Sequence, residues 1–239
     1  MYPDSCAVRH SVESGSIPVP EKKEFILKTT IIFDLDGTLL NTLGDLRGAA
    51  NYALRLRNLP PRTTEEVRRF VGNGVRNLMR RCLPAGSSDE EIDAALADFK
   101  KYYAEHLYDT TVPYDGIQEL LSILRKRGIK VGVLSNKLNS ATQALIRHFF
   151  RGKVDVVFGE HSGIPRKPDP TSCRMIMEQL GAKPEEVLYI GDSGVDMNTA
   201  RNAGLTAVGV TWGFRSREEL IDNGADLLAD LPVQILMML

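Results

Sequence analysis

The feature that most constrains the fold is a set of short apolar runs that do not alternate with polar residues. They are rich in Val and Ile and lie at residues 29–35, 129–135, 154–159, 186–192 and 206–212. Runs of this kind predict strands that are covered by helices on both faces, as in a parallel sheet. Because helical patterns separate them, the sequence predicts an α/β fold with a doubly wound, Rossmann-like parallel sheet.

Four helical patterns occupy the stretches after the first strand and its long connection. They lie at residues 116–128, 140–150, 170–181 and 196–204. In the first pattern, Asp115 is in place to serve as the N-cap, and Gly128 is in place to end the helix.

The region from about residue 44 to residue 110 breaks the alternation, because it contains helical patterns and no convincing strand. Two of its helices begin with capping-box spacing, Thr63 to Glu66 and Ser88 to Glu91. The region is too long for an ordinary connection within an α/β unit. It predicts a helical cap inserted over the carboxyl end of the first strand, where open α/β sheets bind ligands.

These patterns divide the chain into three parts. A stretch rich in Ser, Pro and charge predicts a flexible N-terminal tail at residues 1–24. The α/β core domain is expected to comprise residues 25–43 and 112–239, with an α-helical cap domain at residues 44–111.

Composition argues against several classes of partner. The 239 residues include 30 Lys and Arg against 31 Asp and Glu, so the net charge of −1 predicts neither nucleic acid nor an anionic membrane as partner. No stretch approaches the roughly 20 apolar residues that span a bilayer. Cys6, Cys82 and Cys173 are widely spaced, which favours reduced thiols and a cytoplasmic location.

Two acidic residues follow the first predicted strand. Asp34 and Asp36 are separated by one residue, so both would reach the same side if the strand continued regularly. Gly37 permits a sharp exit from the strand. Two carboxylates this close repel each other and need a cation or a shared proton. Taken alone, the pair also fits a simple cap of the following turn.

Three further groups follow other strands. Asp192 ends the strand at 186–192. Ser135 ends the strand at 129–135, and Asn136 follows it just before a helical pattern. Lys167 lies in a proline-bounded loop. In isolation each group has a plain structural interpretation. Asp192 fits a solvated turn in which Asp196, four residues later, is a helix N-cap. Ser135 fits a simple helix cap, and Lys167 fits a lysine on the surface.

Together these groups are far more specific, because the carboxyl ends of parallel strands meet at one edge of a sheet. Clustered carboxylates without His or Cys suit Mg²⁺. A hydroxyl, amides at a helix start and a lysine suit a phosphoryl group. This combination predicts one aspartate as nucleophile and the other as acid, with a metal bridging them.

The sequence resembles the haloacid dehalogenase superfamily over about residues 28–235. "DLDGT", Ser135–Asn136, Lys167 and "GDSGVD" resemble its four motifs in order and spacing. The helical insertion corresponds to the type 1 cap of that family. Within the family, "LLNTLGDLRGAANYAL" and "VGNGVRNLM" most resemble phosphoglycolate phosphatases.

The resemblance implies a role for each matched residue. Asp34 would be the nucleophile that forms an aspartyl-phosphate, and Asp36 would be the general acid and base. Mg²⁺ would be held by the carboxylates of Asp34 and Asp192 and by the backbone carbonyl of Asp36. Asp196 would orient metal-bound water or Lys167.

The same resemblance assigns the substrate contacts. Ser135 and the Asn136 amide would hold phosphoryl oxygens beside Lys167. Residues 72–74 would close near the leaving group. Arg76 is either a contact for a substrate carboxylate or a surface charge within a basic run.

The leading hypothesis is a Mg²⁺-dependent phosphatase acting on a small phosphorylated metabolite, with 2-phosphoglycolate as the first choice. A pyrophosphatase or a phosphomutase similar to β-phosphoglucomutase is the alternative within the family. A receiver-type signalling domain or a non-catalytic phospho-ligand binder is the alternative from another class. Monomer and homodimer are both left open.

Overall fold

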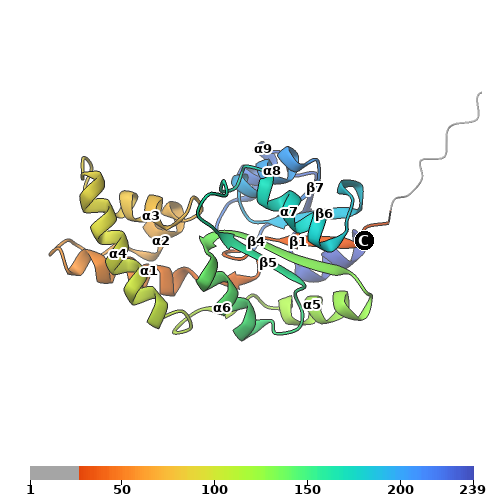
Figure 1. Ribbon diagram of the computed structural model, residues 1–239, viewed down its shortest axis with the longest axis horizontal. Coiled ribbons are helices and arrows are strands. Elements are labelled where there is room, and N and C mark those ends of the chain that lie inside the picture. The colour runs from red at the N-terminus through yellow and green to blue at the C-terminus, as the bar shows by residue number, and fades with distance from the viewer. Residues whose placement is uncertain (1–26) are drawn as a thin grey trace, which may run out of the picture.

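A six-stranded parallel sheet lies at the centre of the computed structural model, which describes residues 27–239 (Figure 1). Its strand order is β5-β4-β1-β6-β7-β8, and every neighbouring pair is parallel. The strands are β1 (Thr30–Phe33), β4 (Lys130–Leu138), β5 (Val156–Glu160), β6 (Val187–Gly191), β7 (Thr206–Val210) and β8 (Leu227–Ala229). The predicted doubly wound parallel sheet is confirmed. The tail predicted at residues 1–24 lies outside the described residues.

Helices cover both faces of this sheet (Figure 1). They are α5 (Ile117–Lys126), α6 (Asn139–Phe149), α7 (Thr171–Leu180), α8 (Gly194–Ala203) and α9 (Arg217–Asp222), with 3₁₀ turns at Pro184–Glu186 and Pro232–Met237. Ile31 and Phe33 of β1 belong to one apolar cluster, whereas Ile32 between them belongs to the other. The central strand is therefore buried on both faces, which explains why its sequence does not alternate.

Two local expectations for the helix boundaries are wrong. Asp115 does not cap α5, because Gly116 occupies the N-cap position with a φ of 83°, which favours glycine. Helix α6 does not follow Asn136 directly, because β4 continues to Leu138 before the helix begins. Ser135 and Asn136 therefore lie within a strand and not at a helix N-terminus. Gly128 does follow the end of α5, as expected, with a φ of 72°.

The four helices that follow β1 and precede α5 gather at one end of the molecule (Figure 1). They are α1 (Leu43–Arg55), α2 (Thr64–Phe70), α3 (Val75–Cys82) and α4 (Asp89–Glu105), and we call them the cap. The capping boxes predicted at the starts of α2 and α4 are both present. The division of the chain into two domains at residues 44–111 stays a prediction.

The chain enters and leaves the cap at neighbouring points. Strand β2 (Leu40–Asn41) pairs antiparallel with β3 (Val112–Pro113). Just beyond this pair, the buried Asp45 carboxylate accepts hydrogen bonds from the backbone amides and hydroxyls of Thr110 and Thr111, over distances of 2.5 to 2.9 Å. Asp45 therefore joins the first turn of α1 to the strand that returns from the cap.

Two simpler features agree with the sequence. Cys82 and Cys173, the cysteines within residues 27–239, are buried and not joined by a disulfide. None of the helices in this part of the chain combines the length and the apolarity needed to cross a membrane.

Candidate active site

Asp34 stands where β1 stops. Its backbone amide still donates to Ile190 of β6 at 2.8 Å, but the strand itself ends at Phe33. The chain then folds into a tight turn in which the Leu35 carbonyl accepts three successive amides, and Gly37 has a φ of 90°. Because the strand does not continue regularly, Asp34 and Asp36 do not share a face by strand periodicity. The turn gives each carboxylate its own surroundings.

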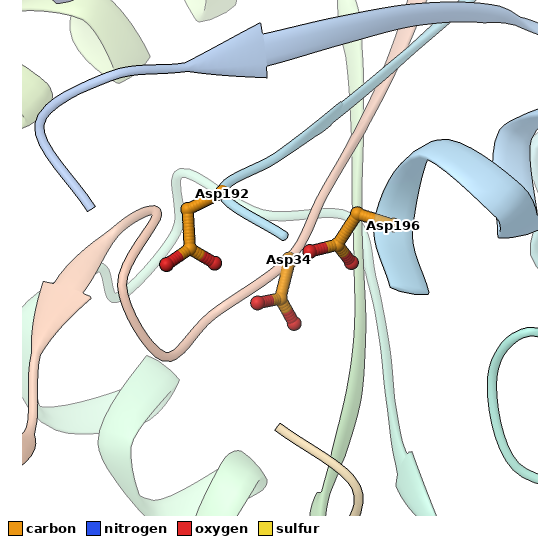
Figure 2. Close-up of side chains that lie close together, drawn as sticks. All are labelled: Asp34, Asp192 and Asp196. Atoms are coloured by element: carbon orange, nitrogen blue, oxygen red, sulfur yellow. The ribbon is translucent and has the colours of Figure 1, made fainter. Parts of the chain in front are cut away.

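Asp34 belongs to a buried cluster of three carboxylates (Figure 2). Asp192 follows the end of β6, and Asp196 lies in the first turn of α8. One oxygen from each of the three lies within 4.8 Å of the others. The three side chains turn toward one another in Figure 2, so the predicted convergence of residues 34 and 192 at one sheet edge is observed.

Lys167 is the cation that enters this cluster. Its Nζ lies 2.7 Å from an oxygen of Asp34 and 2.7 Å from an oxygen of Asp196. The second oxygen of Asp196 accepts from the amide and hydroxyl of Ser193, which completes the capping box of α8. Asp196 is therefore at the third position of its helix and not at the N-cap. Its contact with Lys167 agrees with one of the two roles that the resemblance implies, orienting metal-bound water or Lys167, and the role itself stays a prediction.

The electrostatics of the cluster follow from burial. Desolvation raises the pKa of Asp34 to about 7, with Lys167 opposing the rise and Asp196 adding to it. Burial also raises the pKa of Asp192 well above its ordinary value, and the neighbouring carboxylates raise it further. Desolvation alone would lower the pKa of Lys167, but the two carboxylates that it contacts raise it well above its ordinary value. One lysine thus contacts two of the three buried acids, Asp34 and Asp196.

This donor set fits a hard divalent cation. Carboxylate oxygens are what Mg²⁺ prefers, and a second positive charge would offset the excess of buried acid. The backbone also packs tightly on Asp192: a Cβ at Gly37 would lie 2.1 Å from its Oδ2, and one at Gly213 would lie 2.2 Å from its Cβ. The Oδ2 of Asp192 accepts a hydrogen bond of 2.7 Å from the Phe214 amide, and this bond orients the carboxylate.

Asp36 points to a different set of partners. Its Oδ1 accepts from the Thr42 hydroxyl at 2.6 Å and from Lys137 Nζ at 2.8 Å, while its Oδ2 lies 3.1 Å from the same Nζ. Burial alone would lower the pKa of Lys137, but the Asp36 carboxylate raises it above its ordinary value. Each aspartate of "DLDGT" therefore has its own lysine, which removes much of the repulsion expected between them.

Ser135 and Asn136 are both buried beside these groups. The Ser135 hydroxyl accepts from the Lys137 amide at 3.2 Å. The Asn136 side chain binds the backbone of Lys167 in both directions, accepting its amide at 2.9 Å and donating to its carbonyl at 3.2 Å. The Asn136 side chain thus braces the loop that carries Lys167, and its backbone amide stays the candidate contact for a phosphoryl oxygen.

All six predicted site residues line one cavity between the core and the cap. They are Asp34, Asp36, Ser135, Asn136, Lys167 and Asp192. The opposite wall comes from the cap and is mostly apolar, with Leu46, Val71, Val75 and Leu78 beside the two glycines of residues 72–74. The loop at residues 72–74 therefore lines the cavity, and its closeness to the leaving group stays a prediction.

Arg76 does not line this cavity. Its guanidinium pairs with Asp93 at 2.7 Å and with Asp89 at 2.8 Å, both on α4 of the cap. This geometry favours the surface-charge interpretation of Arg76. Arg215, which follows β7, lines the cavity instead and donates to the carbonyls of Arg68 and Val71 at the end of α2.

Lys137 and Arg215 are the charged cavity residues that sequence reasoning missed. Lys137 directly follows Ser135–Asn136 on the strand end, so its position was a usable signal. Arg215 follows the strand predicted at 206–212, in the loop leaving the same sheet edge. Both carry a positive charge, which a site for an anionic substrate requires.

Comparison with known proteins agrees with this geometry. Residues 31–210 match the family model for haloacid dehalogenase-like hydrolases. A phosphoglycolate phosphatase from Pseudomonas putida is 34% identical over 85% of this chain and 77% of its own length. One from Rhodospirillum rubrum is 36% identical over 82% of this chain and 84% of its own.

A solved structure from Lactobacillus delbrueckii subsp. bulgaricus, provisionally assigned as a phosphoglycolate phosphatase, superposes with a TM-score of 0.83. It is 37% identical and covers 87% of this chain and 97% of that one. The resemblance stated from the motifs is confirmed: this chain belongs to the haloacid dehalogenase-like hydrolases and within them is similar to phosphoglycolate phosphatases.

Proposed function

We propose that this protein is a Mg²⁺-dependent phosphatase that hydrolyses a small phosphomonoester through an aspartyl-phosphate on Asp34, with 2-phosphoglycolate as the first substrate to test. The observation that carries the proposal is the buried Asp34 carboxylate, which clusters with Asp192 and Asp196 and lines one cavity together with Asp192 and Lys167. The assigned activity of the relatives from Pseudomonas putida and Rhodospirillum rubrum supports the choice of substrate.

The first step forms a bond between an Asp34 oxygen and phosphorus and breaks the bond from phosphorus to the ester oxygen. Asp36 donates a proton to that departing oxygen, so the product leaves as a neutral hydroxyl. In the second step Asp36 takes a proton from water, whose oxygen attacks the phosphorus of the aspartyl-phosphate. Inorganic phosphate departs and the Asp34 carboxylate is restored.

The charges around Asp34 make this approach feasible. An anionic carboxylate and an anionic phosphate repel each other unless cations lie between them. Lys167, 2.7 Å from Asp34, is placed to contact the phosphoryl oxygens, with Ser135 and the Asn136 amide alongside. Mg²⁺ held by Asp34, Asp192 and the Asp36 carbonyl would supply the remaining positive charge at the phosphoryl group.

The cap wall argues for a small leaving group. The side chains of the cap wall are mainly apolar. The two cavity lysines, Lys137 and Lys167, come from the core and are already paired with aspartates. Arg215 lines the same cavity and donates to backbone carbonyls of the cap. Its Nε also lies 3.5 Å from a carboxylate oxygen of Glu219. It is therefore the candidate to contact a substrate carboxylate in place of Arg76.

The test is phosphate release from a panel of phosphomonoesters, with and without Mg²⁺, by wild type and by Asp34→Asn. We expect Mg²⁺-dependent release by wild type that is lost in the variant, with 2-phosphoglycolate among the best substrates. Release that persists in Asp34→Asn contradicts the assignment of the nucleophile. Phosphate that stays on the product and does not appear in solution indicates a phosphomutase.

A further inference from the structure

Lys137 is a buried cation to which the proposed reaction gives no role. Its side chain is 1% exposed, and its Nζ contacts both oxygens of Asp36 at 2.8 and 3.1 Å. On its other side the Nζ lies 4.8 Å from the centroid of the Tyr103 ring. Lys137 comes from β4 of the core and Tyr103 from α4 of the cap, so this contact crosses the boundary between them.

The surroundings of this lysine account for its burial. A buried ammonium group is costly unless it is paired and hydrogen-bonded, and the Asp36 carboxylate supplies the pair. An aromatic face attracts a cation, more strongly when water is excluded. Tyr103 is fully buried, and its hydroxyl finds no hydrogen-bond partner within residues 27–239. The contact of Tyr103 with Lys137 at cation–π distance is made by its ring.

The two oxygens of Asp36 are not equivalent. Oδ1 accepts from Thr42 and makes the shorter contact with Lys137, whereas Oδ2 has the longer Lys137 contact alone. Oδ2 is thus the oxygen with capacity to exchange a proton with a substrate, and Asp36 lines the cavity. Lys137 and Thr42 together fix the direction in which it points.

We propose that Lys137 is a positioning residue for Asp36, and that the Tyr103 ring holds Lys137 in place from the cap, which makes proton transfer depend on the cap being seated on the core. The inference rests on the proposed function, in which Asp36 protonates the departing oxygen. It leads to a specific consequence for the first step, which kcat/KM reports, because that step depends on the position of Asp36 only where the leaving oxygen needs a proton.

The experiment compares an alkyl phosphomonoester with p-nitrophenyl phosphate, whose leaving group departs readily without a proton. We expect Lys137→Met to lower kcat/KM for the alkyl ester by about 10²-fold, and kcat/KM for p-nitrophenyl phosphate by less than about tenfold. Lys137→Arg keeps the charge and is expected to recover part of the alkyl activity. Lys100→Met, an exposed lysine on α4, is the matched control. Equal losses on both esters, or no loss on either, overturn the proposal.

Two variants of Tyr103 test the contact between the cap and Lys137, and both keep the buried charge of Lys137. Tyr103→Leu deletes the aromatic face and is expected to show the same preferential loss on the alkyl ester. Tyr103→Phe keeps the ring and is expected to show no such preference. Equal losses on the two esters in Tyr103→Leu, or a preferential loss in Tyr103→Phe, contradict the role of the ring.

Asp36→Asn distinguishes the two levels of inference. If Asp36→Asn shows the preferential loss and Lys137→Met does not, the positioning role fails and the proposed reaction stands. If Asp36→Asn itself lowers kcat/KM equally for both esters, Asp36 is not the acid, and the proposed reaction fails together with the positioning role that rests on it.

Discussion

The two walls of the cavity differ in kind. The core wall presents six charged side chains at strand ends or in the loops beside them: Asp34, Asp36, Lys137, Lys167, Asp192 and Arg215. The cap wall presents apolar side chains and glycine backbone. The charged residues of the cap pair instead with one another, as Arg76 does with Asp89 and Asp93. The comparison indicates that the core supplies the chemistry and that the cap supplies shape.

The largest expected effect lies on the core wall, at Lys167. Lys167→Met leaves two buried carboxylates without their cation, so we expect unfolding to become easier by about 3 kcal/mol or more. Phosphatase activity should fall by ~10³-fold. Because a divalent cation would compensate for the lost charge, Mg²⁺ should raise the melting temperature of the variant more than that of wild type.

Calorimetry with and without Mg²⁺ checks this expectation. Lys126→Met, an exposed lysine on α5, serves as the control for loss of a positive charge. A Lys167→Met protein as stable as wild type would mean that the charges of the core wall are not balanced by this lysine.

The next effect concerns the joint between the walls. Asp45→Ala removes a buried acceptor of four hydrogen bonds and leaves the amides and hydroxyls of Thr110 and Thr111 without it. We expect a loss of about 3 kcal/mol in the free energy of unfolding, measured by urea denaturation. Asp222→Ala, at an exposed acid of the core, should change little. Similar effects of the two substitutions would show that the joint does not depend on Asp45.

A smaller effect is expected where the walls touch. Arg215→Met withdraws the guanidinium that binds the carbonyls of Arg68 and Val71 and that lines the cavity. We expect KM for 2-phosphoglycolate to rise by about tenfold, with a smaller change in kcat, because an interaction that holds cap and substrate is lost. Steady-state kinetics on both constants provide the check, and an unchanged KM would remove Arg215 from the substrate contacts.

The smallest effect is expected within the cap. Arg76→Met breaks ion pairs that are exposed to solvent, and such pairs contribute little. We expect KM to change by less than about twofold in the same kinetic assay. A rise in KM as large as that of Arg215→Met would restore the substrate-carboxylate role that the sequence suggested for Arg76.

The contrast between the walls also explains what the sequence could reveal. Strands buried on both faces, such as β1, leave an unbroken apolar run, and residues at their ends must converge, so Asp34 and Asp192 were predictable. The short strand β8 and the two-residue strands β2 and β3 leave no such pattern. Their pairing depends on contacts between distant segments.

The choice between Arg76 and Arg215 shows the same limit. Local sequence places both arginines near glycines and helix starts, but the angle at which the cap sits on the core decides which of them meets the cavity. Lys137 was missed because a lysine beside polar residues is usually solvated, and only the fold brings Asp36 and Tyr103 around it. The N-cap at Asp115 failed because the left-handed backbone at Gly116 took that position.

The pairing of β2 with β3 has a consequence for how such a protein can change. Asn41 lies opposite Val112, so the whole segment between them is attached to the core as a single long hairpin loop would be. A segment whose two ends are already adjacent can be lengthened, shortened or exchanged with little change to the spacing of the strands around it. Substrate preference can therefore diverge among descendants of this chain while Asp34 and Asp36, only a few residues before the insertion point, keep their geometry.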